Sequence, residues 1–542
     1  MVLASSTGKK MFLRDATGLV RQLTALDAYI MAVSVISIGG AVQTSITLLG
    51  LYPGADLVWA FTIGLIPAIA FILVYSIQTA AFPRSGGDYV WVSRIGGFAT
   101  GFIFSWLLQF SYLFAILGLQ SYYVAWIGVP SVLTSMGVLL HADSLMALST
   151  ALTSSQSLAF GVCLAFLVVG ALICLFGPVL YSRVMKALWV YGMLGIVVWI
   201  FLLVTSTKAG FISAFNSAMA GTTSYDGIIK AATDQGLLSA TSLGPTLIAS
   251  LTLGWTAWAG FNYSVYASGE IKNVSRSVPV ALTAGLITSW AFLIGVFALA
   301  GNVFGADFMG AMSALSVSGG LKMPVGPSMS FLIAMLTNNP AMMFVVTSTL
   351  IVWWLMILPP LYMAGSRIIF AWSYDRMIPA KLADVNDRLH SPINAILLCL
   401  FANAIWAFVI TYTVYGAWIG LSFIQGVGWT VPGFVAAAFP YVKKDLYERT
   451  VGTLPRAFSR KIAGVPLITI GGLVQGISMV LYTYAVVFPT FTFISLSPAL
   501  VSAVEQVLGL VLIGAAYVFG VRAYRKRQGI DLRMIFEEIP PE

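Results

Sequence analysis

Two apolar stretches of this chain carry glycines and polar side chains near their centres, where a smooth run of Leu, Ile and Val would be expected. The first contains Ser37-Ile-Gly-Gly-Ala41 and the second contains Trp255-Thr-Ala-Trp-Ala-Gly-Phe-Asn262. If the helix unwinds at these points, free amides could hold a carboxylate and free carbonyls could hold an ammonium or a cation. The same glycines could instead let neighbouring helices approach closely.

The elements that would position these residues are membrane-spanning helices. Hydrophobic residues make up 59% of the chain and charged residues only 9%, whereas a soluble domain has roughly 25% charged residues. A span needs about 20 mainly apolar residues. We predict an all-α integral membrane protein with twelve transmembrane helices, near residues 24–49, 57–80, 99–126, 158–176, 184–204, 246–268, 280–300, 341–370, 393–412, 418–439, 467–488 and 500–521.

Basic residues are distributed very unevenly between the segments that separate these spans. Counted from the N-terminus, the odd-numbered segments hold 25 of the 28 Lys and Arg residues, and the even-numbered ones hold only Lys208, Lys230 and Lys322. Because Lys and Arg accumulate in short cytoplasmic loops, we predict a multi-pass protein of the cell membrane with both termini cytoplasmic. These flanks, facing an anionic lipid leaflet, explain the net charge of +9 without a nucleic-acid partner.

Few other residues suggest a disulfide, a metal site or a catalytic site. Cys163, Cys174 and Cys399 lie within predicted spans, so they suit packing rather than a disulfide framework. His141 and His390 lie in loops on opposite sides of the membrane, which excludes a site with two histidine ligands. The chain contains no phosphate-binding glycine loop with lysine and no recognisable nucleophile motif. We therefore expect no enzyme, no metal site and no cofactor.

The two glycine-containing spans are the first and the sixth. This spacing is typical of inverted repeats, spans 1–5 against spans 6–10, each opening with a discontinuous helix. Unwound backbone at membrane depth is tolerated only where it lines a cavity, but these residues alone leave unwinding and packing equally open. The predicted segments are a cytoplasmic tail (1–22), a first repeat (23–206), an external loop (207–243), a second repeat (244–441), a cytoplasmic loop (442–464), spans 11 and 12 (465–524) and a cytoplasmic tail (525–542).

Three motifs, in the right order and topology, resemble the amino acid–polyamine–organocation (APC) family of transporters. Phe82-Pro-Arg-Ser-Gly-Gly-Asp-Tyr89 follows span 2 and resembles the family's Pro-x-x-Gly-Gly-x-Tyr motif. Glu270-Ile-Lys-Asn-Val-Ser-Arg-Ser-Val-Pro279 and Tyr374-Asp-Arg-Met-Ile-Pro379 resemble the family's loops after spans 6 and 8. The resemblance covers about residues 20–440. It implies a leucine-transporter-like fold, a 5+5 inverted repeat with two extra C-terminal helices.

The resemblance also implies a substrate site at the two breaks. Backbone amides of the span 1 break, around Gly39, Gly40 and Ala41, would hold a substrate carboxylate, and carbonyls of both breaks would hold its ammonium. Aromatic side chains of span 6 would supply bulk, and one of them could close over the substrate as a lid. The candidate substrate-binding residues are Ser37, Ile38, Gly39, Gly40, Ala41, Trp255, Thr256, Trp258, Ala259, Gly260, Phe261 and Asn262.

Several details depart from the family pattern or stay open. The usual Gly-x-Gly of span 1 is replaced by Gly39-Gly40-Ala41, and the usual acid after the span 6 glycine is replaced by Asn262. Trp255, Trp258 and Asn262 would share one helical face, which could equally pack against a neighbouring helix. Gln425 in span 10 is a further candidate for the far wall of the site.

Energy coupling can also be addressed through the resemblance. Many relatives place a Lys of span 5 where sodium binds in cousins with this fold, but the matching position here falls near Gly192, and Lys186 lies at the inner end of the span. Sodium-coupled cousins use hydroxyls of span 8, and residues 351–363 have none. We predict that sodium does not drive transport. Direct proton coupling is also poorly supported, because no acid reaches the expected site, which leaves exchange or a proton carried with the substrate.

These observations favour a secondary active or exchange transporter that moves amino acids or related amines by alternating access. The expected partners are the small-molecule substrate and the lipid bilayer, and the oligomeric state is left open. A channel is the first alternative, although no filter sequence of the usual type is present. A non-transporting sensor or scaffold with the same fold is the second, and the departures at Ala41, Gly192 and Asn262 keep it open.

Overall fold

The computed structural model describes residues 18–111, 115–418, 420–488 and 498–537, and most of them are helical. The first half comprises α1 (Ala25–Ile36), α2 (Ile38–Leu48), η1 (Leu49–Leu51), α3 (Leu57–Ile63), α4 (Leu65–Ala81), α5 (Asp88–Ile95), α6 (Phe98–Ser111), α7 (Leu117–Tyr123), η3 (Val124–Gly128), α8 (Val129–Leu139), α9 (Asp143–Ser154), α10 (Gln156–Leu175), α11 (Gly177–Thr205), α12 (Lys208–Ala218) and α13 (Tyr225–Asp234).

The second half is equally helical and adds one small hairpin. Its elements are α14 (Leu243–Ala249), η4 (Ser250–Gly254), α15 (Trp255–Trp258), η5 (Phe261–Glu270), α16 (Val274–Phe304), α17 (Ala306–Val317), α18 (Met329–Ala334), α19 (Pro340–Tyr374), η6 (Ala380–Ala383), α20 (Ile393–Tyr412), α21 (Tyr415–Trp418), α22 (Leu421–Val442), α23 (Lys444–Thr453), η7 (Arg456–Ser459), β1 (Lys461–Ile462), β2 (Val465–Pro466), α24 (Leu467–Val487), α25 (Pro498–Arg527) and α26 (Leu532–Glu537).

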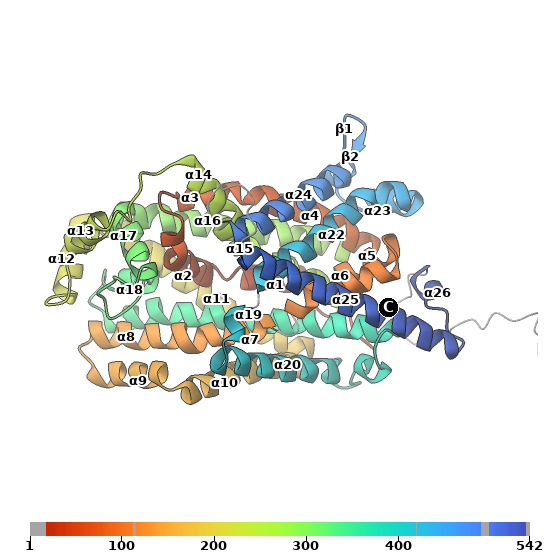
Figure 1. Cartoon of the computed structure of the whole chain (residues 1–542), viewed down its shortest axis with the longest axis horizontal. Coiled ribbons are helices and arrows are strands. Elements are labelled where there is room, and N and C mark those ends of the chain that lie inside the picture. The colour runs from red at the N-terminus through yellow and green to blue at the C-terminus, as the bar shows by residue number, and fades with distance from the viewer. Residues whose placement is uncertain (1–17, 112–114, 419, 489–497, 538–542) are drawn as a thin grey trace, which may run out of the picture.

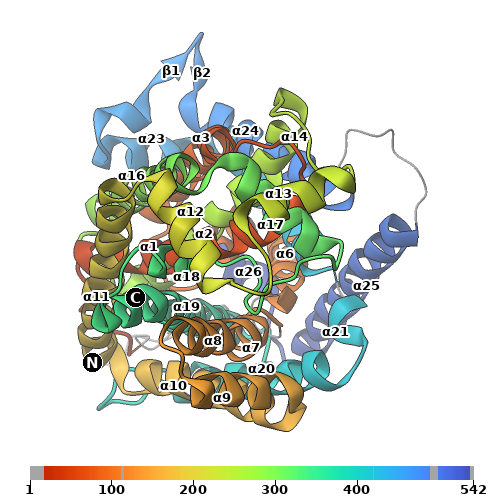
Figure 2. The same cartoon turned by 90° about the vertical axis from the view of Figure 1, so that its left-hand side faces the viewer.

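The long helices run along the long axis of the molecule, and short elements gather at both ends (Figure 1). One end, here called the terminal face, carries α5, α23 and α26, and the described chain begins there, since Leu23 forms a bridge with Ile271 after η5. The opposite end, here called the loop face, carries α12, α13, α17 and α18. Figure 2 shows α12 and α13 lying over the ends of the long helices, with α25 at the edge of the bundle.

Among the described residues, eleven helical stretches are long and apolar enough to cross a membrane. They match the predicted spans, with two differences. Predicted span 6 is not among them, because its helix is interrupted between Trp258 and Phe261. The predicted end of span 3 at Trp126 is wrong, because the helix continues through η3 and α8 to Leu139, a short stretch of π-helix replacing the expected stop.

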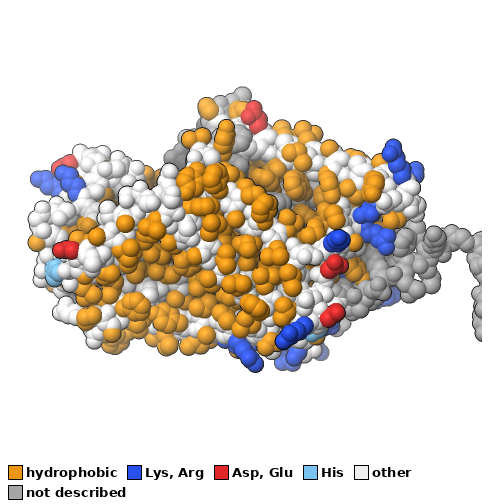
Figure 3. Space-filling view, turned by 90° about the horizontal axis from the view of Figure 1, so that it is seen from below, with side chains coloured by type: hydrophobic (Ala, Val, Ile, Leu, Met, Phe, Trp, Pro, Cys, Tyr) orange, Lys and Arg blue, Asp and Glu red, His pale blue; other side chains and the backbone are white. Residues whose placement is uncertain are grey.

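A broad apolar band covers the middle of one side of the molecule (Figure 3). Figure 3 shows hydrophobic side chains covering the centre of one side, with Lys and Arg gathered towards the two ends. On α11, Leu194, Phe201 and Val204 are each more than half exposed, and on α20 Phe401 is 65% exposed. Such exposure is unfavourable in water but suits contact with lipid. The fold is therefore that of a multi-pass membrane protein.

Buried ion pairs hold the helices together at the terminal face. The Arg94 guanidinium binds both carboxylate oxygens of Asp375, at 2.7 and 2.8 Å, which ties α5 to the end of α19. Arg367 of α19 binds both oxygens of Glu270 at the end of η5, at 2.6 and 2.9 Å. All four side chains are buried. Two-point arginine–carboxylate pairs fix orientation as well as distance, so this face is closed by contacts of defined geometry.

Candidate substrate cavity at two helix breaks

The first predicted span is interrupted at a single residue. Ser37 adopts the left-handed conformation (φ 51°, ψ 71°), so α1 ends at Ile36 and α2 begins at Ile38. Its hydroxyl donates to the Trp353 carbonyl of α19 at 3.0 Å, which holds the break against a neighbouring helix. The prediction that unwinding extends to Ala41 is wrong, because the Ala41 amide already donates to the Ser37 carbonyl at 2.7 Å and starts regular helix.

The two glycines after this break are helical, and tertiary packing explains them. A Cβ atom on Gly39 would lie 2.6 Å from the Trp353 ring, and one on Gly40 would lie 2.7 Å from Nε1 of Trp354. Each indole also faces a second glycine. A Cβ on Gly192 would lie 3.1 Å from the Trp353 ring, and one on Gly128 would lie 2.6 Å from the Trp354 ring. Two adjacent tryptophans of α19 thus occupy two slots, each bordered by a pair of glycines.

The break in the sixth span is of a different kind. α15 ends at Trp258, Ala259 has an extended backbone (ψ 127°), and Gly260 is left-handed (φ 95°) before η5 begins at Phe261. The predicted interruption of this span is confirmed at Ala259 and Gly260. A Cβ on Gly260 would collide with the Val35 side chain of α1, so the two breaks lie against each other. Here a glycine is needed both for the backbone conformation and for the close approach.

A cavity of about 380 Å³ borders both breaks and extends from them toward the loop face. Ser37 and Ala259 lie at the breaks themselves, whereas Leu48 and Tyr52 mark the end nearer the loop face. The volume falls within the range of small-molecule sites, about 300–1,000 Å³. The walls come from α1, α2, α7, η4, α15, η5, α19, α22 and α24, so helices far apart in the sequence converge on one space.

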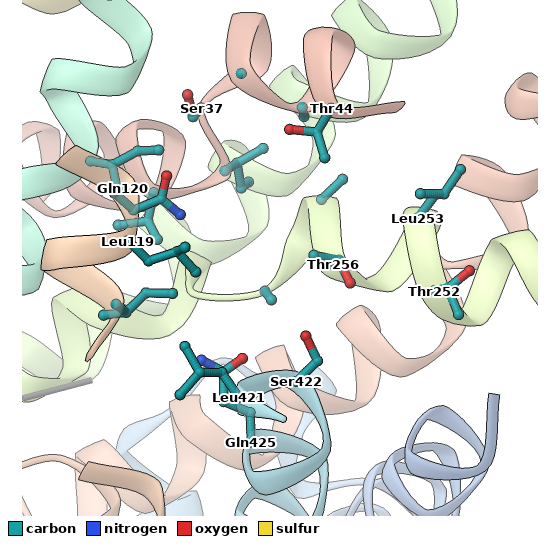
Figure 4. A pocket seen from close by; sticks show the side chains of 18 of the residues that line it. Ser37, Thr44, Leu119, Gln120, Thr252, Leu253, Thr256, Leu421, Ser422 and Gln425 are labelled. Carbon is teal, nitrogen blue, oxygen red and sulfur yellow. The ribbon is translucent and has the colours of Figure 1, made fainter. Parts of the chain in front are cut away.

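Polar but uncharged groups line this cavity. The Tyr482 hydroxyl of α24 interacts with the hydroxyls of Thr256 and Ser422, and Figure 4 shows Ser422 pointing from α22 toward Thr256. Gln120 of α7 and Gln425 of α22 add amide groups (Figure 4). None of the described residues that line the cavity is Asp, Glu, Lys, Arg or His. Charge in the cavity is therefore supplied by backbone dipoles at the helix breaks rather than by side chains.

Backbone groups at the breaks are suited to a substrate that carries a carboxylate and an ammonium group. The amides of Ile38, Gly39 and Gly40 form the first turn of α2, where no carbonyl four residues earlier in the same helix can accept them. The carbonyls of Thr256 and Trp258 lie in the last turn before the span 6 break. A helix N-terminus attracts negative charge and a C-terminus attracts positive charge.

The structure divides the predicted site residues into two groups. Ser37, Gly40, Ala41, Thr256 and Ala259 line the cavity, as does Gln425, the additional candidate of span 10. The others are buried beside it without lining it; they are Ile38, Gly39, Trp255, Trp258, Gly260, Phe261 and Asn262.

The aromatic face predicted on span 6 packs into the helix bundle. Trp255 lies 4.6 Å from the Phe71 ring, and Trp258 lies 6.0 Å from the Phe61 ring, so the packing alternative holds for both. The aromatic walls of the cavity come instead from residues that the sequence did not single out: Tyr52, Tyr123, Tyr263, Trp354, Trp429 and Tyr482. Their helices lack any local signal for a site, because ordinary apolar spans also contain tyrosine and tryptophan.

Two π-helical stretches border the cavity. η3 follows Tyr123, a lining residue, and η4 includes Thr252 and Leu253, which also line it. A π-turn frees a backbone carbonyl and widens the helix, and such turns occur frequently at functional sites. No residue type in either stretch predicts this geometry from the sequence.

Comparison with known proteins identifies the class. Residues 23–513 match the family model described as amino acid permease. The chain is also 22% identical over 418 residues to a branched-chain amino acid permease of Lactococcus lactis subsp. cremoris, covering 76% of this chain and 79% of the relative. The chain therefore belongs to the amino acid permease family of the APC superfamily. It is a membrane transporter and not an enzyme, as the sequence predicted.

Proposed function

We propose that this protein carries neutral amino acids across the cell membrane by alternating access, with the substrate bound in the cavity at the two helix breaks. The observation that carries this proposal is the meeting of two interrupted helices at a cavity with polar but uncharged walls. Four membrane-length helical stretches lie between the two interrupted spans, in keeping with a 5+5 inverted repeat, and the broken span brings the expected number of spans to twelve. The terminal face, with most of the basic residues, would be cytoplasmic.

The proposed binding mode follows from the helix ends. The substrate carboxylate faces the first turn of α2, where Gly40 lines the cavity. The ammonium faces the carbonyls near Thr256 and Ala259, which line the cavity at the span 6 break. These two sets of backbone groups bind the part that all amino acids share.

The side chain of the substrate would then decide selectivity. It points into a space walled by aromatic and aliphatic groups together with hydroxyls and amides, without a counter-charge for a basic or acidic side chain. Burying an unpaired charge there is costly, which favours neutral side chains. The related permease from Lactococcus is named for branched-chain amino acids, and leucine is therefore the first compound to test.

Sodium is not the proposed driving ion. Trp353 fills the space between Ser37, Gly39 and Gly192, and its indole nitrogen donates to the Gly192 carbonyl at 3.2 Å. Of the hydroxyls one turn earlier on α19, Ser348 bonds to Tyr191 at 2.6 Å and Thr349 donates to the Val345 carbonyl. A cation site at this position would need several oxygens free to replace water.

Uptake into proteoliposomes tests the proposal. Radiolabelled leucine should exchange against internal leucine, and excess unlabelled isoleucine should compete, whereas lysine and glutamate should not. Replacing an imposed sodium gradient by a choline gradient should leave uptake unchanged. Uptake without saturation or competition would indicate a channel, and binding in a thermal-shift assay without any flux would indicate a sensor; either result contradicts the proposal.

A further inference from the structure

The carboxyl group of Asp88 is completely buried at the start of α5, near the terminal face. Its Oδ1 accepts the Tyr89 amide at 3.0 Å, and its Oδ2 accepts the hydroxyls of Tyr75 at 3.0 Å and of Tyr266 at 2.8 Å. Among the described residues, no Lys or Arg forms an ion pair with it. A buried carboxylate without a counter-charge is costly, and such a group tends to bind a proton instead.

The hydroxyls around Asp88 belong to two spans. Tyr75 comes from α4 and Tyr266 from η5, and Tyr263 of η5 packs its ring 5.7 Å from the ring of Tyr266. Of the other elements packed against α5, α6 has no titratable residue, and the single titratable residue of α22, Tyr441, is 65% exposed at its C-terminal end. α26, whose sequence includes Arg533 and Glu537, meets α5 at Arg94, which lies over the Phe536 ring at 4.9 Å. The carboxyl therefore faces phenols rather than charges.

The charged residues near this group are directed elsewhere. Arg94, on the same helix, is bound by Asp375, and the Tyr89 hydroxyl also donates to Asp375, at 3.0 Å. Arg84, in the loop before α5, lies over the Tyr374 ring at 5.1 Å. Asp88 thus contrasts with Asp375, which has its own arginine. The protonation state of Asp88 depends on its burial and on the hydroxyl groups that donate hydrogen bonds to it.

Polar groups connect this carboxyl to the substrate cavity. Tyr263 lines the cavity and neighbours Tyr266. Asn262, which is 1% exposed, lies against the Tyr75 hydroxyl, yet its amide nitrogen and oxygen have no well-formed hydrogen bond among the described residues. The buried Ser264 hydroxyl, also on η5, is likewise without a partner there. Buried polar atoms of this kind bind water, and tyrosine hydroxyls with water can pass a proton.

η5 is attached to the loop that carries Asp88. The Gly86 amide donates to the Tyr266 carbonyl at 3.0 Å, and the Ser268 hydroxyl donates to the Arg84 carbonyl at 2.7 Å. An opening of the terminal face that separates η5 from this loop would take Tyr266 away from Asp88 and admit water to the carboxyl.

We propose that Asp88 is a proton-binding site that couples transport to proton movement, an inference that rests on the transport function proposed above. With the terminal face closed, the carboxylate takes up a proton from water in the cavity along the path through Tyr263, Asn262 and Tyr75. When the face opens, the Oδ2–H bond breaks and the proton passes to water on that side. One proton thus crosses with each substrate, and no other reactant is needed.

The direction of coupling follows from the environment of the carboxyl. Burial raises the pKa of Asp88 from its ordinary value of 3.8 to about 6 in the closed arrangement. Hydration on opening returns the pKa toward the ordinary value, so the closed form holds the proton more tightly than the open form. Acid therefore favours the closed face, and opening releases a proton at mildly acidic pH, between these two pKa values.

Leucine transport by the full chain in proteoliposomes tests this inference. The wild type should accumulate leucine when the outside is acidified and should not do so without a pH gradient. Asp88→Asn should keep leucine–leucine exchange but lose gradient-driven accumulation by at least about fivefold. Glu448→Gln, which changes an exposed carboxylate of α23 on the same face, should behave as the wild type.

A second variant keeps the test decisive if Asp88→Asn fails to fold. Tyr266→Phe keeps the carboxyl but removes one hydroxyl that lowers its pKa, so the acid midpoint of the pH–rate profile should move to higher pH. A purely structural role would lower the rate without moving the midpoint. Gradient-driven accumulation by Asp88→Asn, or an unmoved midpoint in Tyr266→Phe, overturns the inference while leaving the transport function in place. Absence of any leucine exchange by the wild type would contradict both this inference and the proposed transport function.

Discussion

The glycines of the two helix breaks look alike in the sequence but do different work in the structure. In span 1, Gly39 and Gly40 are ordinary helical residues, and the backbone leaves the helix at Ser37. In span 6, Gly260 is itself left-handed and lies at the break. The first pair of glycines makes room for side chains of α19, whereas Gly260 supplies a backbone conformation.

This difference shows that packing and unwinding are separable tasks. At the span 1 break, a serine carries the unusual φ angle, and a hydrogen bond to the Trp353 carbonyl stabilises it. At the span 6 break, no side chain of the described residues caps the turn, so the residue must tolerate a positive φ without cost. Substitutions should therefore affect the two breaks in different ways.

The largest effect is expected at Gly260. Gly260→Val places a β-branched residue at φ 95° and drives its Cβ into Val35, combining backbone strain of about 1–3 kcal/mol with a steric collision. Folded protein and uptake should both be lost. Gly295→Val on α16, where nothing lies within 4 Å of an added Cβ, is the matched control. Equal melting temperatures for the two variants in detergent would show that Gly260 is not required by the break.

A large but more selective effect is expected at Gly40. Gly40→Leu should abolish leucine uptake while the protein stays folded and inserted, because the new side chain enters the cavity and the Trp354 slot. Gly40→Ala should lose part of the activity through overpacking of about 1–3 kcal/mol. Adding Trp354→Phe, a smaller ring, should restore activity. A double-mutant cycle without coupling between the two sites would contradict the slot assignment.

A smaller effect is expected at Trp353. Trp353→Phe removes the indole donor to the Gly192 carbonyl and leaves space in the slot, so the free energy of unfolding should fall by about 1–3 kcal/mol. Trp59→Phe, at a position that is 60% exposed, is the control and should be nearly neutral. Unfolding curves by circular dichroism measure both. Sodium stimulation appearing in Trp353→Phe would also show that the indole occupies a latent cation site.

The smallest effect is expected at Ser37. Ser37→Gly relieves the left-handed strain, worth about 1–2 kcal/mol, but loses the hydrogen bond to Trp353, worth about 0.5–1.5 kcal/mol. The two changes nearly cancel. Ser37→Ala loses the bond and keeps the strain, so it should be the less stable variant by about 1 kcal/mol. Because both variants lack the hydroxyl, the reverse order of melting temperatures would mean that the left-handed φ angle at this position carries no strain that glycine relieves.

The helical membrane architecture could be predicted from the sequence because it depends on long apolar runs and on the placement of Lys and Arg. The interruption of span 6 could also be predicted, since Ala259-Gly260 breaks a helix locally. The extent of the span 1 break could not, because a left-handed serine gives no sequence signal. The contacts of Gly39 with Trp353 join residues more than 300 positions apart, and no local pattern indicates them.

Within the site, the residues that contribute backbone groups could be predicted from the sequence better than the side chains that line the cavity. Thr256 and Ala259 line the cavity because they flank the break itself. Trp255 and Trp258 face the helix bundle, since the side of a helix that meets a cavity depends on its neighbours. Asp88 was visible only as part of a motif, because its burial and its two tyrosine partners come from three separate segments.

The glycine slots also constrain how this protein can change over evolutionary time. Each tryptophan of the pair fits only while both of its glycines remain, so a single substitution at any of the six positions damages the fit. Neutral drift is then blocked unless two or three changes arrive together. Among relatives, we expect positions 39, 192 and 353 to vary as one group, and positions 40, 128 and 354 as another.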